Sequence, residues 1–588
     1  MNKIHDMSGK DYSAGKAAPW YRNPAILITG GVLLLYVVLY ILPLGYRPLV
    51  IPDETRYAEI PREMLATGDW ITPHLVGLRY FEKPPLGYWL NAMSIAVFGE
   101  NEFAVRLPGT LATGLTSLIV FLFTLHVWGS RRIALAAALI HMTCLEVYVV
   151  GTFSVLDNFV TLFLTAGIYA YYLAARRVQG RSASRGLWAL SGVSFGLAFL
   201  AKGFLAFAIP VLVLVPWMLW QGNWRILLTT SWRVILSACL IALPWAILIH
   251  LREGDFWHYF FWIEHIKRFT AENAQHKQPF YYFLMYLPAL AFPWLSLMPA
   301  TISGLRDMDG NASETRGALR FLWLWLLLPF IFFSASSGKL ATYILPCFPP
   351  FAVLSAAGLA AYFRSDRDRQ FDFGMLLNAL ILLCLFAGLF ISQTVDIGFR
   401  AYDENEQIKF YLITTLLFLG ASAGLASVLT TRLNIKLAST LALIALPLLG
   451  ISFVVPNETS MSKSPGQSLL QYRNLVTDKT IIISDTAMMH AVGWYLKRDD
   501  MYLIGTGEVE YGLGYPDASH RLLDPDRFRS LLQRDASRHS ILMACRRECP
   551  EQMTALLPPA ARKDTWGRFT FWYVPQAGAA GQNSVTAQ

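Results

Sequence analysis

The sequence predicts a mostly α-helical, polytopic membrane protein with a small soluble α/β domain near its C-terminal end. Of the 588 residues, 55% are hydrophobic and only 15% are charged, and the mean hydropathy is +0.41. A soluble protein of this length does not need so much apolar surface. Apolar runs of about 20 residues, enough to cross a bilayer as a helix, recur until Pro456. After Pro456 the composition changes to that of a soluble domain.

About thirteen apolar segments have the length expected of membrane spans. The first, from Ala25 to Leu44, has no small-residue cleavage site behind it, so we expect an uncleaved anchor and not a signal peptide. All of them belong to a predicted transmembrane domain of residues 1–456. The predicted spans lie near residues 25–45, 105–128, 132–150, 157–175, 187–201, 204–221, 233–251, 281–304, 317–335, 340–362, 373–393, 410–431 and 436–456.

The basic residues orient these spans. With the N-terminus inside, every second connection carries clustered Lys or Arg, such as Arg131 with Arg132 and Arg176 with Arg177, whereas the opposite turns are nearly bare. This alternation is the positive-inside pattern, and an odd number of spans then places the C-terminal domain outside. The net charge of +9 is scattered over loops, so it does not indicate nucleic-acid binding.

Two outer loops carry cations against this pattern: residues 51–86 and the loop between the seventh and eighth spans. The positive-inside pattern does not explain these cations, whereas binding of an anionic ligand would. The alternative is that neighbouring acids such as Glu264 and Glu272 balance them. The cations are Arg56, Arg62, Arg79 and Lys83 in the first loop and Arg252, Lys267, Arg268 and Lys277 in the second.

The first of these loops is too polar to be part of a span and too long for a mere connection. We expect a short amphipathic helix over residues 54–68, with Asp53 as its N-cap and Gly68 as its C-terminal stop. Such a helix between two spans is expected to lie on the bilayer surface. The acid–base pair Glu82–Lys83 closes the loop before two prolines. This density of acid, base and Tyr favours a working site over a solvated connection.

The region of residues 457–575 reads as a soluble α/β domain on the outer side. Segments 481–484, 501–504, 540–545 and 569–574 are predicted strands, and AMMHAVGWYLKR and PDRFRSLLQRDA are predicted helices. The stretch GTGEVEYGLG lacks the strand–helix setting of a nucleotide-binding glycine loop. Cys545 and Cys549 could form a disulfide on the outer side of an envelope. The tail of residues 576–588 is predicted to be disordered.

Polar residues recur where outer loops meet span ends, and they are costly there unless they face water or one another. Acids could act as a general base or position an acceptor, whereas Lys, Arg and Tyr could hold a phosphate. Because no soluble nucleotide-binding fold is evident, such a phosphate is expected to be attached to a lipid. The candidates are Asp53, Glu54, Arg56, Glu82, Lys83, Asp157, Lys202, His265, Arg268, Lys339 and Tyr343.

Each candidate has a simpler alternative. Asp157 begins the fourth span and could be only its N-cap. Lys202 and Lys339 could be helix-end side chains that reach the interface. His265 could be a surface histidine or, with Glu82, a ligand of a divalent metal, although two ligands far apart in sequence are a weak metal pattern.

In order along the chain, PDETRYAEIPREM, FEKPPLGYWL, LDNF, AKG, FFWIEHIKRF and SSGKLATYILPCFPP resemble the aminoarabinose (4-amino-4-deoxy-L-arabinose) transferases of bacterial lipid A modification. These belong to the C-type, polyprenyl-phosphate-sugar-dependent glycosyltransferases, as do the protein O-mannosyltransferases. The resemblance runs through essentially the whole chain. It implies a multi-pass inner-membrane enzyme that moves the sugar from undecaprenyl phosphate to a lipid A phosphate on the periplasmic side, with inversion, giving resistance to polymyxin and cationic antimicrobial peptides.

The resemblance also implies roles for individual residues. Asp53 would be the principal catalytic carboxylate and Asp157 the second acid. Arg56, Lys83 and Tyr343 would hold the donor phosphate, with Lys202, Arg268 and Lys339 as further candidates. No cofactor is expected to be required; a structural zinc ion at Glu82 and His265 is left open. The expected partners are the lipid-linked aminosugar donor, the lipid A acceptor and membrane lipids, and no nucleic acid.

An acceptor phosphate is already largely ionised, unlike the hydroxyl acceptor of a mannosyltransferase, so little deprotonation is required. We therefore expect Asp53 to orient the acceptor or engage the sugar's amino group. Two alternatives remain: a related transferase with another sugar or a protein or glycan acceptor, and a lipid or sugar transporter. The absence of an inverted repeat and the few ionisable residues in the middle of spans argue against transport.

Overall fold

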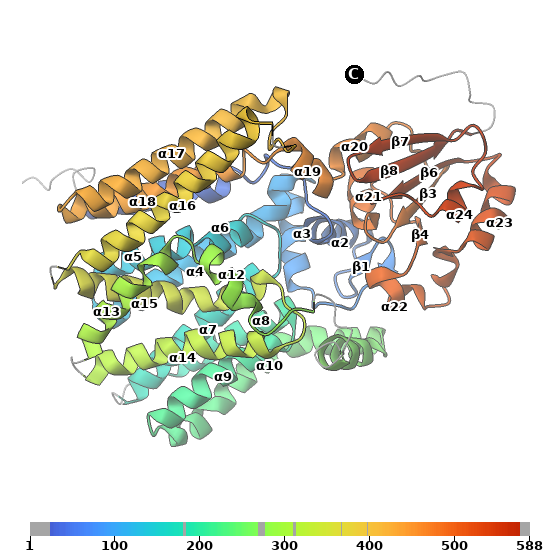
Figure 1. Ribbon diagram of the computed structural model, residues 1–588. Coiled ribbons are helices and arrows are strands. Elements are labelled where there is room, and N and C mark those ends of the chain that lie inside the picture. Colours follow the sequence, from blue (N-terminus) through green and yellow to red (C-terminus); the bar gives the residue numbers. More distant parts are fainter. Residues whose placement is uncertain are drawn as a thin grey trace, which may run out of the picture.

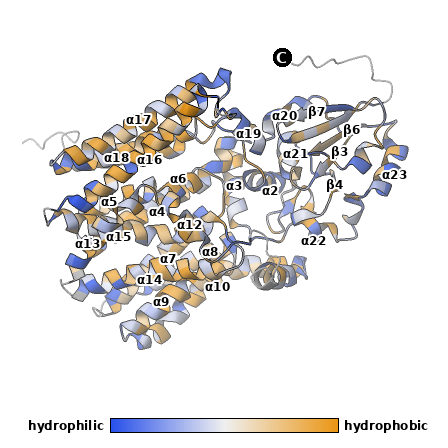
Figure 2. Ribbon diagram, in the orientation of Figure 1, coloured by the Kyte–Doolittle hydropathy of each residue, from blue (hydrophilic) through white to orange (hydrophobic). Residues whose placement is uncertain are grey.

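The structure is a computed structural model that describes residues 24–179, 184–267, 277–309, 313–365, 367–396 and 398–576. A large bundle of helices forms one part of the molecule, and a six-stranded sheet with its own helices forms the other (Figure 1). The apolar residues concentrate in the helical part (Figure 2). This is the predicted fold class, which the structure confirms.

The helical part begins with α1 (Pro24–Tyr36) and the π-helical turn η2 (Val37–Ile41) and ends with α18. Between them lie α2 (Asp53–Thr67), α3 (Leu86–Phe98), α4 (Glu102–Trp128), α5 (Arg131–Thr143), α6 (Leu145–Gly151), α7 (Asp157–Gln179), α8 (Arg185–Lys202), α9 (Leu205–Trp220), α10 (Trp224–Arg252), η3 (His258–Lys267) and α12 (Tyr282–Leu290). These are followed by η4 (Trp294–Leu297), α13 (Met298–Asp309), α14 (Ser313–Ala335), η5 (Ala341–Cys347), α15 (Phe348–Phe363), α16 (Arg369–Thr394), η6 (Glu404–Glu406), α17 (Gln407–Leu429) and α18 (Leu433–Ile451).

Eight helices of the described part are long and apolar enough to cross a membrane, and two bent pairs, α5 with α6 and the α12–α13 segment, bring the number to ten at most. Each of the thirteen predicted spans overlaps a helix, but the segments near 25–45, 187–201 and 204–221 are not among these ten. The number thirteen therefore remains a prediction. The apolar helix α3 (Leu86–Phe98) was not predicted as a span because it directly follows the polar stretch.

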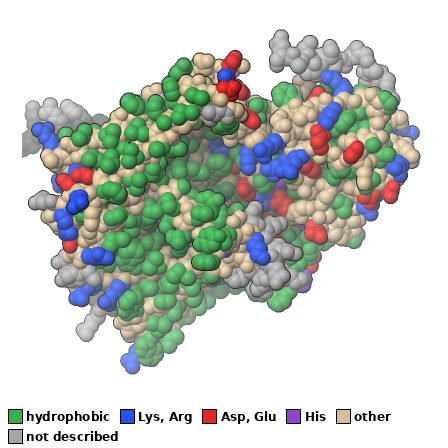
Figure 3. Space-filling view, in the orientation of Figure 1, with side chains coloured by type: hydrophobic (Ala, Val, Ile, Leu, Met, Phe, Trp, Pro, Cys, Tyr) green, Lys and Arg blue, Asp and Glu red, His purple; other side chains and the backbone are tan. Residues whose placement is uncertain are grey.

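The helical bundle exposes apolar side chains outward, as a lipid-facing surface requires. Leu240 and Leu251 on α10, for example, are 65% and 76% exposed. Figure 3 shows hydrophobic side chains covering the face of the bundle, with charged side chains gathered at its far end and over the sheet part. Inside, helices approach closely where both carry Gly: a Cβ on Gly304 would lie 1.9 Å from the carbonyl oxygen of Gly358.

Helix α2 lies between the bundle and the sheet part, where it packs against α3 and α21 (Figure 1). It ends at Gly68, whose φ of 71° is the left-handed conformation expected of a glycine stop. The prediction of Asp53 as N-cap was wrong. Pro52 takes that position, Asp53 is the first helical residue, and no side chain caps the helix because the Asp53 carboxylate binds Arg56 instead. The short hairpin β1 (His74–Leu75) and β2 (Leu78–Arg79) follows.

The C-terminal part is a six-stranded sheet in the order β5-β4-β3-β6-β8-β7. Strands β3 (Thr480–Asp485), β4 (Tyr502–Ile504), β5 (Leu522–Leu523) and β6 (Ser540–Cys545) are parallel. Strand β8 (Phe569–Val574) runs antiparallel to β6, and the edge strand β7 (Arg562–Trp566) runs antiparallel to β8. The connections contain α19 (Asn457–Lys463), α20 (Gly466–Tyr472), α21 (Met489–Leu496), η7 (Gly507–Val509), α22 (Glu510–Leu513), η8 (Ser519–Arg521), α23 (Pro525–Asp535) and α24 (Glu551–Thr554).

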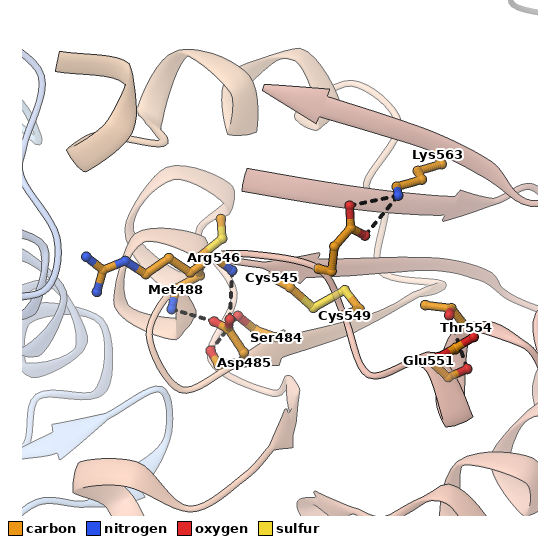
Figure 4. The surroundings of a disulfide bond; sticks show 10 residues. Ser484, Asp485, Met488, Cys545, Arg546, Cys549, Glu551, Thr554 and Lys563 are labelled. Carbon is orange, nitrogen blue, oxygen red and sulfur yellow. Dashed lines mark hydrogen bonds and ion pairs between the residues drawn. A yellow bond between two sulfur atoms is a disulfide. The ribbon is translucent and has the colours of Figure 1, made fainter. Parts of the chain in front are cut away.

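The four predicted strands and both predicted helices are present. Strands β5 and β7 were missed: β5 has only two residues, and β7 is a charged edge strand without an apolar alternation. Cys545 and Cys549 form a disulfide just after β6, beside Asp485 at the end of β3 (Figure 4). Of the tail predicted to be disordered, residues 577–588 lie outside the described residues.

Candidate active site

A buried ion cluster holds the start of α2 in place. The Glu54 carboxylate has no exposed surface and accepts hydrogen bonds from the guanidinium groups of Arg47 and Arg106 at 2.7 to 3.2 Å. Arg106, on α4, also donates to the carbonyl oxygens of Leu44, Arg47 and Pro48. Burial raises the pKa of Glu54, but Arg106 and Arg47 outweigh it and hold the pKa at about 2. The chain before α2 is therefore fixed to the bundle.

Asp53, one residue earlier, has the opposite environment. Its side chain is 54% exposed, and it receives a hydrogen bond from Arg56 at 2.5 Å. The Arg56 guanidinium also donates to the hydroxyl of Tyr80 at 3.1 Å and to Glu508, and it lies 4.0 Å from Glu82. These two adjacent acids therefore differ in environment. Glu54 is buried and fixes the backbone before α2, whereas Asp53 is exposed to solvent.

Glu508 comes from the sheet part, just after the carboxyl end of β4. One carboxylate oxygen binds Arg56 and the other binds the ring of His490 on α21. Burial raises its pKa, but the Arg56 and His490 charges outweigh it, so the pKa is lowered to about 2. The sequence analysis missed both residues. Glu508 lies in GTGEVEYGLG, a glycine-containing stretch without the setting of a nucleotide-binding loop, and nothing in it indicated a partner.

A second cluster joins three of the predicted residues. Asp157 is the first residue of α7, and its carboxylate accepts a hydrogen bond from Lys202, the last residue of α8, at 2.5 Å. The Lys202 ammonium lies 4.7 Å from the ring centre of Tyr343 in η5. Each of the two charged side chains is only about one-seventh exposed (14% for Asp157, 13% for Lys202). Asp157 is thus paired to a cation and is not merely a helix-start residue.

Tyr57, one turn into α2, lies near both clusters. Its ring lies tilted beside that of Tyr88 on α3, with centroids 6.0 Å apart. Burial raises the pKa of Tyr57; the Arg56 charge opposes that rise, and the charges of Asp53 and Asp157 add to it. Asp53 and Asp157 are therefore both near enough to influence the same buried phenol.

Lys83 and Glu82 form the edge of this site. The Lys83 ammonium lies 3.5 Å from Glu264 of η3 and donates to the carbonyl oxygen of Glu82. The Glu82 carboxylate accepts a hydrogen bond from Tyr80 at 2.9 Å. Burial, followed by the nearby negative charge of Glu264, raises the pKa of Glu82. Acids are crowded at this edge.

The remaining predicted residues are placed differently. Lys339 is buried and donates to the carbonyl oxygens of Gln278, at 2.9 Å, and Ser336, so it holds loop backbone together. The side chain of His265 and the whole of Arg268 lie outside the described residues. Among the residues that are described, no group of three or more His, Cys, Asp or Glu side chains is arranged to hold a metal ion.

Several outer-loop cations are balanced by acids rather than open to a ligand. Arg62 forms a bidentate pair with Glu59 at 2.7 Å, and Arg252 pairs with Asp69 at 2.8 Å. Arg79 bridges Glu253 and Asp517, which joins the β1–β2 hairpin to the sheet part. For these three cations the balancing alternative describes the structure better than the ligand interpretation.

A cavity of about 610 Å³ opens beside the site, at the contact between the two parts of the chain. Glu82 and Glu264 line it from the helical part, and Glu508 and Tyr511 line it from the sheet part. Arg56 and Lys83 pair with two of these lining acids, Glu508 and Glu264, so cations and carboxylates meet at the edge of the cavity.

Comparison with known proteins identifies this arrangement. Residues 26–260 match the family model described as dolichyl-phosphate-mannose-protein mannosyltransferase, and residues 460–573 match that of the arabinosyl transferase ArnT C-terminal domain. The chain is similar to the undecaprenyl phosphate-alpha-4-amino-4-deoxy-L-arabinose arabinosyl transferase of Aeromonas hydrophila, with 40% identity over 505 residues, covering 85% of this chain and 90% of the relative. The protein of that name from Erwinia tasmaniensis is 37% identical over 553 residues, 92% of this chain and 98% of the relative.

Solved structures agree with this similarity. The crystal structure of ArnT from Cupriavidus metallidurans bound to undecaprenyl phosphate superposes with a TM-score of 0.76 at 25% identity, covering 94% of this chain and 100% of the other. Its apo state gives 0.74 at 24% identity, covering 93% and 97%, and has the same fold. By its similarity over nearly the full length, the chain belongs to the family of undecaprenyl phosphate-alpha-4-amino-4-deoxy-L-arabinose arabinosyl transferases.

Proposed function

We propose that this glycosyltransferase takes 4-amino-4-deoxy-L-arabinose from undecaprenyl phosphate and places it on a phosphate of lipid A. The single observation that carries the proposal is the pairing of carboxylates with cations next to a polar cavity: Asp53 with Arg56, and Asp157 with Lys202. The relatives' names specify the donor and the sugar, and the related solved structure holds undecaprenyl phosphate. These names do not specify an acceptor, so lipid A as the acceptor is part of the proposal only.

The proposed reaction exchanges one phosphate for another at the sugar's anomeric carbon. The bond from that carbon to the undecaprenyl phosphate oxygen breaks, and its electron pair leaves with undecaprenyl phosphate. An oxygen of the acceptor phosphate forms the new bond on the opposite face, which inverts the configuration. Because the acceptor phosphate is already an anion, no proton has to be removed from it for the exchange to balance.

The cations of the site would stabilise the charge on the leaving phosphate. Negative charge grows on the departing undecaprenyl phosphate, and preorganised cations that face such charge supply a large part of catalysis. Arg56, Lys83 and Lys202 are proposed for this role, together with Tyr343, whose ring lies beside Lys202. Arg56 is held from three sides before any substrate arrives, so little reorganisation is needed.

The carboxylates are proposed to position the acceptor. Asp53 is the more exposed of the two and lies at the open side of the site, whereas Asp157 is tied to Lys202. Asp53 would orient the acceptor group or the sugar's amine, and Asp157 would keep Lys202 directed toward the phosphate. No step needs a metal ion, and a structural zinc ion at Glu82 and His265 is not part of the proposed mechanism.

The chain is a multi-span membrane protein, and we place it in the bacterial inner membrane with the site on the periplasmic side. This follows the positive-inside distribution of its Lys and Arg residues. Residues 1–456 would form the membrane domain and residues 457–575 a periplasmic domain. Adding an aminosugar to a lipid A phosphate lowers the negative charge of the envelope, so cationic peptides such as polymyxin would be attracted less.

The test is a transfer assay with the full chain in proteoliposomes that contain lipid A and the undecaprenyl-phosphate aminosugar, read by mass spectrometry of lipid A. Intact protein should add the mass of one aminopentose, and Lys83→Ala should lose most of that product. Lys563→Ala is the matched control, because Lys563 is also paired with a glutamate, Glu548, but lies on the edge strand β7.

A second function of the same class has one specific observation in its favour. The family model over residues 26–260 is that of a protein mannosyltransferase, so a protein or glycan acceptor is the alternative. If lipid A stays unmodified while the same donor labels a protein or glycan in the proteoliposomes, the acceptor proposal is wrong and the donor proposal stands. If no acceptor is labelled, both are wrong.

A further inference from the structure

The cavity between the two parts of the chain has a single charge sign. Its described lining contains five acids and no Lys or Arg: Glu82, Asp255, Glu264, Glu508 and Glu510. Two of these acids have a basic partner outside the described lining: Arg56 binds Glu508, and Lys83 lies 3.5 Å from Glu264. A phosphate would be repelled by the acids of the lining, whereas a cation would be attracted. The cavity therefore suits a positive group better than a phosphate.

The cavity also lies outside the carboxyl ends of the parallel strands. Glu508, Glu510 and Tyr511 follow the carboxyl end of β4, one strand away from the β3–β6 pair at which the strand order reverses. In open α/β sheets, ligands bind outside the carboxyl ends of the strands. The cavity volume of about 610 Å³ lies within the range of small-molecule sites.

Three tyrosines form the rigid side of the cavity. Tyr511 donates a hydrogen bond to Asp255 at 2.7 Å, and Tyr515 donates to the same carboxylate oxygen. The rings of Tyr259 and Tyr511 lie 4.3 Å apart. Aromatic faces attract cations, and hydroxyl groups fixed in this way have one orientation. Such a wall suits a compact, polar ligand with a positive group.

Several carboxylates share this cavity. Glu82 is 93% buried and lines the cavity together with Glu264 and Glu508. Asp255 and Glu510 complete the acidic part of the described lining. A positive group in the cavity would form charge-assisted hydrogen bonds with these carboxylates.

We infer that this cavity binds the protonated amino group of the donor sugar and so makes the enzyme selective for an aminosugar. The inference rests on the proposed function and extends it, because it assigns the sheet part a direct share in substrate recognition. Glu510 and Asp255 act on the ammonium group, and the tyrosines contact the sugar ring. The phosphate of the donor points the other way, toward Arg56, Lys83 and Lys202.

The test compares two donors that differ only at carbon 4: undecaprenyl phosphate-linked 4-amino-4-deoxy-L-arabinose and the corresponding L-arabinose. In proteoliposomes with lipid A, the wild type should prefer the aminosugar in kcat/KM. Glu510→Gln should reduce that preference about tenfold or more, as expected for a lost hydrogen bond to a charged group, while transfer of the neutral sugar changes little. Asp526→Asn, on the exposed helix α23, is the matched control and should leave the preference unchanged.

Direct binding separates this inference from the proposed function. Saturation-transfer NMR on the full chain in nanodiscs should show free 4-amino-4-deoxy-L-arabinose binding more strongly than L-arabinose, and Glu510→Gln should remove the difference. This result is expected even if lipid A proves not to be the acceptor. Equal binding of the two sugars, an unchanged donor preference in Glu510→Gln, or loss of the preference on chelating divalent metals would each overturn the inference.

Discussion

The adjacent acids Asp53 and Glu54 should respond to the same substitution in opposite ways. Glu54→Gln keeps the shape of the side chain but removes its charge from between Arg47 and Arg106. Asp53→Asn makes the same change at an exposed position. We expect the first variant to lose stability and the second to lose transfer activity, because only Glu54 is fully buried within the ion cluster.

The structure gives the size of the effect for Glu54. The pKa of this carboxyl falls from 4.5 to about 2, and a difference of one pH unit corresponds to about 1.4 kcal/mol. The ionised form therefore stabilises the fold by roughly 3 kcal/mol relative to an uncharged one. Removing one partner of a buried ion pair costs about 3 to 5 kcal/mol, which agrees.

For Asp53 the expected cost in stability is small. An exposed pair with Arg56 and a favourable position at a helix start contribute about 1 kcal/mol or less. Loss of a carboxylate that orients a reacting group lowers the rate by about 100-fold. The two variants should therefore separate stability from catalysis within two adjacent positions.

The assay measures the thermal midpoint of the full chain in detergent together with the transfer rate per folded molecule. Glu54→Gln should lower the midpoint clearly, and the protein that remains folded should keep its activity. Asp53→Asn should keep the midpoint and lose the rate. The reasoning fails if Glu54→Gln retains the wild-type midpoint, or if Asp53→Asn lowers the midpoint as much as Glu54→Gln.

Acid pH provides an independent check on Glu54. A carboxyl whose pKa is lowered by folding stabilises the protein fully above its unfolded value, and this stabilisation is lost as the pH falls through the folded value. For Glu54 that window runs from 4.5 down to about 2. The stability difference between wild type and Glu54→Gln should shrink across this window, and a difference that stays constant would contradict the assignment.

Three further predictions concern other parts of the chain. Lys202→Met should leave its carboxylate partner without a counter-charge and reduce transfer at least about tenfold, whereas Lys202→Arg should restore part of it; a donor titration that separates kcat from KM is the measurement. The double variant of Cys545 and Cys549 to Ala should lose about 2 kcal/mol of sheet-part stability, since the closed loop is short, and should keep its transfer activity; thermal unfolding under oxidising conditions checks this. Gly493→Ala should loosen the contact of α21 with α2, because the added Cβ would lie 2.4 Å from the Glu59 carboxylate, and faster proteolysis between the two parts would report it.

Local patterns in the sequence were sufficient for the class of the protein and for its elements. Apolar runs predicted the membrane helices, and the alternation of basic residues predicted their orientation. Gly68 ended α2 as expected, since a glycine in the left-handed conformation is a local signal. Four strands of the sheet followed from apolar β-forming runs, whereas β5 and β7 had no such run to show them.

The ordered motifs also named Asp53, Arg56, Lys83 and Asp157, whose roles at the site stay a prediction. They did not show which member of an acid pair is structural. Glu54 and Asp53 are equivalent in sequence, and only the position of Arg106, 52 residues from Glu54, buries one and leaves the other open. Likewise, the ligand interpretation of the outer-loop cations could not foresee the carboxylates that pair with Arg62, for the pairing depends on side-chain packing.

The sequence by itself determined a membrane-embedded glycosyltransferase, because hydrophobic length, charge bias and local motifs are properties of short segments. The tertiary structure decided how its chemistry is assembled. Glu508 reaches Arg56 across 452 positions of sequence, and the acids of the cavity come from three separate segments. No local sequence pattern predicts such contacts, because they arise from the packing of the sheet part against the membrane helices. That packing brings Arg56 and Lys83 against the carboxylates of the cavity.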